Sequence, residues 1–153
     1  MRNILVFAVL CLSTLMQAQT PSEKCEQRYN MLSAQFGPAG VGVETVLDNW
    51  EKVDSTNAKL LLARFDFLFT KAQSVKVVMK DSKKYLGMEP ILTFKDSLQR
   101  NVYCYQETFY DDELYGKAIQ SIDKAIAVHP DKLDFRFVKA NALIAYEKES
   151  PVL

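Results

Sequence analysis

The spacing of hydrophobic residues predicts helices along most of the chain after residue 20. Tyr29, Leu32 and Phe36 recur at intervals of three and four positions, which is typical of one apolar helical face. We expect this helix to have its N-cap at Ser22 and to end at Gly37-Pro38-Ala39-Gly40. The first element is therefore predicted to be an amphipathic helix.

Two further helices are predicted before residue 73. One runs from Val43 to Asp54, the other from Ala58 to Ala72, and Ser55-Thr56-Asn57 separates them and offers N-caps. The earlier helix has its apolar residues on one side: Val43, Leu47, Trp50 and Val53. The later helix is apolar nearly all round, which predicts a central position in the fold.

The middle of the chain changes character. Lysines dominate residues 74–90, which Gly87 and Pro90 punctuate, and we expect an irregular connection there. Two β-prone runs follow, Ile91 to Lys95 and Asn101 to Gln106, separated by five residues. They predict an inserted β-hairpin over about residues 90–107.

Two more helices are predicted at the C-terminal end. One opens at Asp111 and Asp112, runs to about Val128 and ends at His129-Pro130-Asp131, because proline disfavours helical backbone in the residue before it. The last runs from Leu133 to Glu147, with Leu133, Phe137, Ala140 and Ile144 on one face. Since no helix follows, we expect its leftover apolar residues to meet the N-terminal helix, a second copy of the chain or a partner (Phe135, Phe137, Val138, Ala142 and Ile144). The alternative is that the chain is a shortened relative of a longer array.

Two helix-turn-helix segments match each other at an offset of 75 residues. Leu47 falls on Ile122 and Val53 on Val128, and beyond the turn Leu60 falls on Phe135. The conflicting pairs are Glu51 with Ile126, Lys52 with Ala127 and Leu61 with Arg136. A register that continues through a turn indicates one repeated structural unit.

The second of these segments resembles a tetratricopeptide repeat. Ala118, Ile122, Ala125 and Pro130 occupy the small, large, small and proline positions of that pattern, and Tyr115 fits the aromatic before them. The first segment is more degenerate, because Trp50 stands at a small position and Ser55 replaces proline.

More specifically, the pair resembles a family of secreted bacterial proteins with tetratricopeptide-like helices. The resemblance implies a mainly α fold of antiparallel helical hairpins, over residues 19–153, with a small inserted β-hairpin; a generic helical bundle is the alternative. It also implies which residues pack the repeats: Leu47, Trp50, Val53, Ala118, Ile122, Ala125, Pro130 and Ala140.

The first 18 residues are typical of a signal peptide. Arg2 precedes an uncharged apolar run from Ile4 to Leu10, and Met16-Gln17-Ala18 is an approximate cleavage site. A lipoprotein acylated at Cys11 is less well supported, since Leu10 is not small; a buried first helix is the other alternative. The pattern predicts export to the periplasm or beyond, with no membrane span left after cleavage.

Composition narrows the function further. The chain has 153 residues, 48% of them hydrophobic and 25% charged, which is typical of one soluble globular domain. Lys plus Arg and Asp plus Glu both number 19, so no net field favours nucleic acid. The chain retained after cleavage has two cysteines, Cys25 and Cys104, which form either a disulfide or two small buried thiols.

Little in the sequence points to catalysis, a cofactor or a metal. His129 is the single histidine, with no evident nucleophile beside it, and we expect it to end a helix. Glu107, Asp111, Asp112 and Glu113 form an acidic group that suits either helix capping or a calcium or acid–base site. Nearby aromatic residues suit either core packing or a peptide or glycan surface (Tyr103, Tyr105, Phe109, Tyr110 and Tyr115).

The sequence thus predicts an exported, non-enzymatic tetratricopeptide-like scaffold that binds a protein or peptide, with self-association possible through its last helix. The alternative is a periplasmic hydrolase or glycan-binding accessory that uses the acidic and aromatic residues around Glu107 to Asp112.

Overall fold

The fold is mainly α with a small antiparallel sheet. The computed structural model describes residues 19–149, so the predicted signal peptide lies outside the described residues. Within this range the elements are α2 (Pro21–Phe36), α3 (Val43–Val53), α4 (Ala58–Ala72), β1 (Gln73–Lys80), β2 (Leu92–Lys95), β3 (Asn101–Tyr110), α5 (Asp112–Val128) and α6 (Leu133–Glu149).

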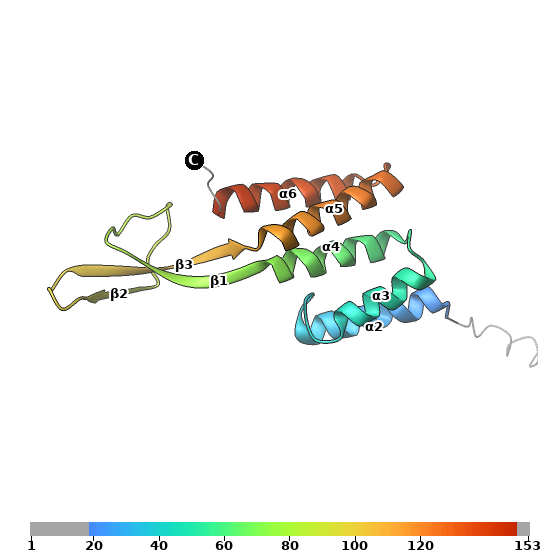
Figure 1. The fold of residues 1–153 in the computed structure, drawn as a ribbon, viewed down its shortest axis with the longest axis horizontal. Coiled ribbons are helices and arrows are strands. Elements are labelled where there is room, and N and C mark those ends of the chain that lie inside the picture. The colour runs from blue at the N-terminus through green and yellow to red at the C-terminus, as the bar shows by residue number, and fades with distance from the viewer. Residues whose placement is uncertain (1–18, 150–153) are drawn as a thin grey trace, which may run out of the picture.

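The helices form a stack from which the sheet projects (Figure 1). Helix α4 continues directly into β1, and β3 leads through Asp111 into α5. The Asp111 N–H donates to the Ala72 carbonyl oxygen at 2.8 Å and closes the junction. The antiparallel strands β1 and β3 therefore extend the α4–α5 pair, and the insertion leaves the contact between these helices intact.

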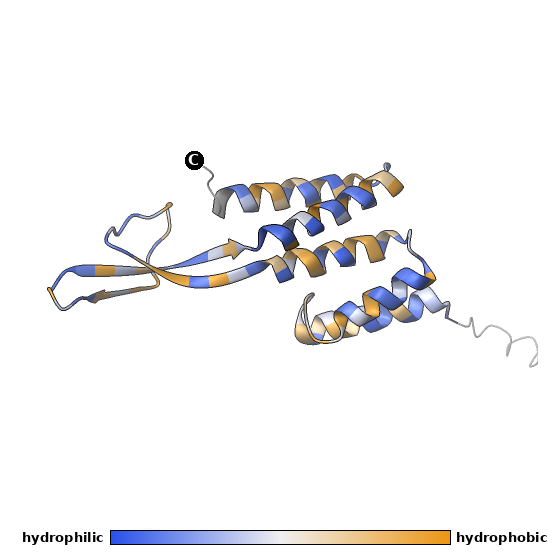
Figure 2. Ribbon diagram, in the orientation of Figure 1, coloured by the Kyte–Doolittle hydropathy of each residue, from blue (hydrophilic) through white to orange (hydrophobic). Residues whose placement is uncertain are grey.

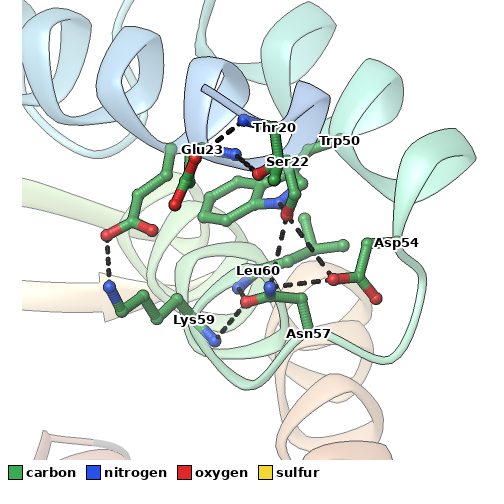
Figure 3. Close-up of polar contacts among 9 residues, drawn as sticks. Thr20, Ser22, Glu23, Trp50, Asp54, Asn57, Lys59 and Leu60 are labelled. Carbon is green, nitrogen blue, oxygen red and sulfur yellow. Dashed lines mark hydrogen bonds and ion pairs between the residues drawn. The ribbon is translucent and has the colours of Figure 1, made fainter. Parts of the chain in front are cut away.

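The N-terminus of α2 is capped differently from our prediction. Thr20 is the N-cap, and Thr20 and Glu23 form a reciprocal capping box. Ser22, predicted as the N-cap, instead lies within the first turn, where its hydroxyl accepts a hydrogen bond from Trp50 Nε1 at 2.8 Å (Figure 3). Proline at the first helical position explains the shift, because Pro21 fits a helix only in its first turn.

The hydroxyl of Ser22 is the centre of a polar network that joins three elements. The Asn57 side-chain amide donates to Ser22 Oγ at 3.3 Å and to Asp54 Oδ2 at 2.9 Å. Asn57 also caps α4, since its Oδ1 accepts from the Lys59 N–H. The start of α2 is thereby fixed to the turn between α3 and α4 (Figure 3).

The α3–α4 and α5–α6 pairs have matching turns. Helix α3 ends at Val53 and α5 at Val128, while α4 begins at Ala58 and α6 at Leu133, so both bounds differ by 75 residues. The residues after α3 and α5 have similar backbone angles, with φ −155° and ψ 78° at Asp54 and φ −127° and ψ 69° at His129. Each of them donates its N–H to the carbonyl four residues earlier.

Burial follows the same offset. Five of the ten buried residues of the first pair have buried counterparts in the second: Val43 and Ala118, Leu47 and Ile122, Trp50 and Ala125, Leu60 and Phe135, Phe67 and Ala142. Three residues predicted to pack are exposed instead: Val53, Pro130 and Ala140. Pro130 lies in the turn after α5, outside the packed helix. Val53 is the last residue of its helix, past the final packed turn, and Ala140 faces outward from α6.

Helix α4 is central, as predicted, because two apolar clusters meet on it. Leu60, Ala63 and Phe67 pack against α3, with Trp50 fully buried in the same cluster. Its opposite side contributes Leu61 and Phe65 to a second cluster, which also contains Ala118, Ile122, Ala125, Phe135 and Ala142. Burial on both sides explains why the helix has little polar surface.

The sheet is larger than the predicted hairpin, and the prediction of irregular chain from residue 74 is wrong as far as residue 80. Strand order is β1-β3-β2, and β3 extends to Tyr110. In β1, the apolar residues Val75, Val77 and Met79 alternate with Lys76 and Lys80. This lysine-rich stretch therefore has the two-residue alternation of apolar and polar side chains that is typical of a strand. The lysine ammonium groups lie over aromatic rings, Lys76 over Phe109 and Lys80 over Tyr85.

The hairpin between β2 and β3 closes without an Asn-Gly or Asp-Gly turn. Asp96 Oδ1 accepts the N–H groups of Leu98 and Arg100, at 2.8 and 2.9 Å. Those hydrogen bonds, the Arg100 backbone bond first, lower the pKa of the Asp96 carboxyl. Gln99 adopts a positive φ of 63° to complete the loop.

Replacing Ser22 with alanine should destabilise the protein. The buried Trp50 indole N–H would lose its acceptor, which costs about 1–3 kcal/mol. Urea unfolding followed by tryptophan fluorescence measures this directly. Ser33→Ala, on the same helix with an exposed hydroxyl, should change the unfolding free energy by less than about 0.5 kcal/mol. Equal losses in the two variants would contradict a specific role for the Ser22 network.

Replacing Asp66 with asparagine should stabilise the protein at neutral pH. Burial raises the pKa of Asp66 above its ordinary 3.8, so the folded chain disfavours the charged form. The matching residue of the second pair is already Asn141. The gain should be full above the raised pKa, shrink as pH falls and vanish below 3.8, where both states bind the proton.

Thermal melts of the two proteins from pH 3 to pH 8 would follow this difference. Asp131→Asn, in the exposed turn before α6, is the control and should leave the melting temperature unchanged. A destabilised Asp66→Asn protein at pH 7 would show that the carboxylate makes a favourable contact that outweighs its burial.

Candidate functional site

Two grooves run between neighbouring helices. Groove I, about 540 Å³, lies between α2 and α3 and is lined by Lys24, Cys25, Arg28, Leu32, Gly42, Thr45, Val46 and Asn49. Groove II, about 430 Å³, lies between α4 and α5, beside α3, and is lined by Asp48, Glu51, Leu60, Leu61, Arg64, Lys117, Gln120, Ser121 and Lys124.

The two grooves occupy equivalent places in the stack. Thr45, Val46 and Asn49 of groove I correspond, at the offset of 75, to Gln120, Ser121 and Lys124 of groove II. The opposite walls correspond as well, at an offset of 36: Lys24, Cys25 and Arg28 on α2 match Leu60, Leu61 and Arg64 on α4.

The difference between the two offsets is explained by the insertion. Residues 73–111, from the start of β1 to the N-cap of α5, number 39, and removing them reduces the offset from 75 to 36. Without the sheet, equivalent positions of successive helix pairs therefore lie 36 residues apart. Helix α2 occupies the place of α4 in a preceding repeat.

Groove II holds a network of ion pairs. Arg64 donates to Asp48 at 2.8 Å and to Glu51 at 3.1 Å, and the Lys124 ammonium lies 3.3 Å from the other oxygen of Glu51. Lys117 pairs with Glu113 one turn earlier on α5, at 2.6 Å. Lys124 and Lys117 are about half exposed, so a ligand carboxylate can reach them without removing a buried charge.

Groove I is lined by cations without acidic residues. Lys24 and Arg28 supply the charges from α2, and Cys25, Leu32 and Val46 supply the apolar surface. Together the linings of the two grooves contain five cations and two carboxylates. Helix α3 lies between them, and its residues line both. The combined surface favours an extended ligand with acidic groups.

The structure gives each carboxylate of the predicted acidic group a separate partner. Asp111 caps α5 by accepting the Leu114 N–H at 2.9 Å, as the capping hypothesis predicts. Glu107 pairs with Lys80 at 3.5 Å, Asp112 accepts from the Tyr146 hydroxyl, and Glu113 pairs with Lys117. Among residues 19–149, no three His, Cys, Asp or Glu side chains are grouped so that they could hold a metal ion.

Two of the five predicted aromatic residues pack where the sheet meets the helices. Tyr110 and Tyr115 contact Phe69 and Tyr146, and the Tyr115 and Tyr146 rings stack with centroids 4.1 Å apart. Burial, and then the neighbouring Tyr146, raise the pKa of Tyr115. Tyr105 is fully buried against the 81–90 loop, where its hydroxyl donates to the Ser82 and Lys83 carbonyls.

His129 connects the two turns. It follows the last residue of α5, as predicted, and its Nε2 lies 2.6 Å from the Thr56 carbonyl oxygen in the other turn. Because a carbonyl oxygen only accepts, Nε2 carries the hydrogen. The imidazole therefore holds the two helix pairs in register.

The two cysteines are free thiols in separate parts of the molecule. Cys25 is half-buried on α2, against the cluster around Trp50, and Cys104 is buried in β3 of the projecting sheet. The alternative of two small buried thiols describes this arrangement better than a disulfide.

The grooves were not predicted as sites from the sequence. Lys24, Arg28 and Lys124 look like ordinary solvated charges of amphipathic helices, and only the stacking brings them to one surface. The signal that could have located them is the repeat register itself, because it aligns Thr45 with Gln120 and Arg28 with Arg64.

Comparisons of the chain with protein-family models, curated proteins and solved structures find no match. Between residues 19 and 149, no helix has the length and apolar character needed to cross a membrane.

Proposed function

We propose that this protein is an exported, tetratricopeptide-like scaffold that binds an acidic segment of another protein along grooves I and II. The observation that carries the proposal is the equivalence of the grooves, since residues at matching positions of a 36-residue repeat line both. Repeated grooves on a helical stack suit an extended segment that makes similar contacts in successive units.

The charges favour acidic side chains on that segment. Lys24 and Arg28 line groove I, which has no acidic residue. In groove II three cations face two carboxylates, and Lys117 and Lys124 stay about half exposed although each pairs with a glutamate. Apolar residues at the floor, such as Leu61, Leu32 and Val46, suit small apolar side chains between the acidic ones. Export is supported by the first 18 residues, and it implies a partner outside the cytoplasm.

Export predicts processing after Ala18. The protein isolated from the envelope or medium of a bacterial host should begin at Gln19, as determined by N-terminal sequencing. Replacing Leu5 and Val9 with arginine should retain the unprocessed chain in the cytoplasm, since the apolar run would be interrupted. An intact N-terminus on the wild-type protein would contradict export by cleavage after Ala18.

Binding can be tested with a photo-crosslinking amino acid at Thr45 in groove I and at Gln120 in groove II. Both positions should give adducts with the same partner in the native cell envelope, because one segment is expected to cross both grooves. Gln99, in the loop at the tip of the sheet, is the control position and should not give that adduct.

Charge reversal then tests the recognition. Lys24→Glu with Lys124→Glu should reduce both adducts at least about tenfold, because two attractive contacts become repulsive. A matched change at Lys95, in β2, should leave them unaltered. Adducts that persist in the double variant, or that form equally from Gln99, would contradict binding in the grooves.

A further inference from the structure

Helix α6 has an apolar face that is equivalent to covered faces of α2 and α4. On α2, the half-buried residues are Ser22, Cys25, Glu26, Tyr29, Leu32 and Ser33. Counting forward by 36 gives, on α4, Ala58, Leu61, Leu62, Phe65, Leu68 and Phe69. Counting forward again by 75 gives, on α6, Leu133, Arg136, Phe137, Ala140, Leu143 and Ile144.

The next helix pair covers this face in the first two cases. Cys25, Tyr29 and Leu32 pack against the cluster of α3 and α4. All six residues of the α4 face pack in the cluster that α5 and α6 complete. Among residues 19–149, no helix pair covers the face of α6: Leu133 is 61% exposed, Phe137 66% and Ile144 62%.

The inner side of α6 is already used. Phe135 and Ala142 are buried in the cluster with α5, and Val138 packs against it. The helix therefore has apolar residues on two sides, as α4 does, although α5 is the one helix that it packs against in the described stack (Figures 1 and 2). The predicted contact with the N-terminal helix is not made, since α2 packs at the other end, against α3.

We infer that the outer face of α6 binds the same face of a second copy of this chain, in an antiparallel pair about a two-fold axis. The stripe Leu133, Phe137, Ala140 and Ile144 has the spacing i, i+4, i+7 and i+11 of a helix-pairing seam. Centring the pair between Phe137 and Ala140 places Leu133 opposite the second copy's Ile144, and Phe137 opposite its Ala140. Each large Phe137 then meets a small Ala140 at the centre of the seam, and Leu133 meets Ile144 at its two ends.

Charge does not oppose this pairing. The stripe itself is uncharged, and the nearest cation on the face, Arg136, donates to the Pro130 carbonyl oxygen at 2.7 Å, which turns it toward the start of the helix. Lys139 is directed to the inner side, where it pairs with Asp123 at 2.6 Å. A parallel pair, by contrast, would place Phe137 against Phe137 and leave Ala140 against Ala140.

The area of the α6 face determines how tightly the two copies are expected to bind. One pair of helices buries less than the roughly 1,200 Å² typical of stable interfaces, so the dimer should dissociate on dilution. Two-fold pairing through α6 also covers the exposed outer helix of each copy, so no further copy can add to the stack at that end. The inference rests on the equivalence of the helices and is independent of the ligand of the grooves, so failure of either test leaves the other proposal standing.

Sedimentation equilibrium of the processed chain between about 1 µM and about 1 mM tests the pairing. The wild-type protein should shift from monomer to dimer within this range. Phe137→Glu should remain monomeric throughout, with an unchanged melting temperature, since the side chain is mostly exposed in a single copy. Ile144→Lys, at the far end of the stripe, provides a second disruption should the first variant fold poorly.

The matched control is Phe36→Glu, because Phe36 is an exposed phenylalanine at the end of α2. It should dimerise like the wild type. A wild-type protein that stays monomeric at the highest concentration would overturn the inference. So would a dimer that persists in Phe137→Glu and Ile144→Lys, or an open series of oligomers that grows with concentration, since that implies head-to-tail contacts.

Discussion

Packing of α4 against α5 is the contact on which the rest of the structure depends. Leu61 and Phe65 of α4 pack against Ala118, Ile122 and Ala125 on α5, and this cluster joins the two helix pairs. The alanines let the helix axes approach, so the large α4 side chains fill the space between them. Groove II lies along the edge of the same contact, which means that its width is set by these residues.

That contact also explains how the chain tolerates a sheet inserted between α4 and α5. An antiparallel ribbon keeps its ends close together, so β1 and β3 return the chain to the position from which it left. The Asp111 to Ala72 hydrogen bond and the Phe69, Tyr110 and Tyr115 rings fix this junction. The sheet projects from the stack and leaves the repeat register unchanged (Figure 1).

The helices were predictable from the sequence because their signals are local. The bounds of α4 follow from Asn57 as a cap and from a continuous apolar run, and the end of α5 follows from Pro130. Strand β1 was missed because its lysines, which pack over Phe109 and Tyr85, resemble a solvated loop in sequence. The N-cap of α2 and the grooves depend on residues that are distant in the sequence: Ser22 contacts Trp50, and Lys117 and Arg64 come from different helices to line groove II.

The α6 pattern shows how a repeat register constrains a surface. A helix at the end of a stack should be polar on its outer side, because apolar side chains exposed to water there do not stabilise the fold. In α6, five of the six outward positions are apolar, and the sixth is Arg136. The same six positions in α4 pack against the next helix pair. An outer helix of the described stack that retains an interior pattern is therefore best explained by a neighbour, and a second copy offers a stripe of matching length and spacing.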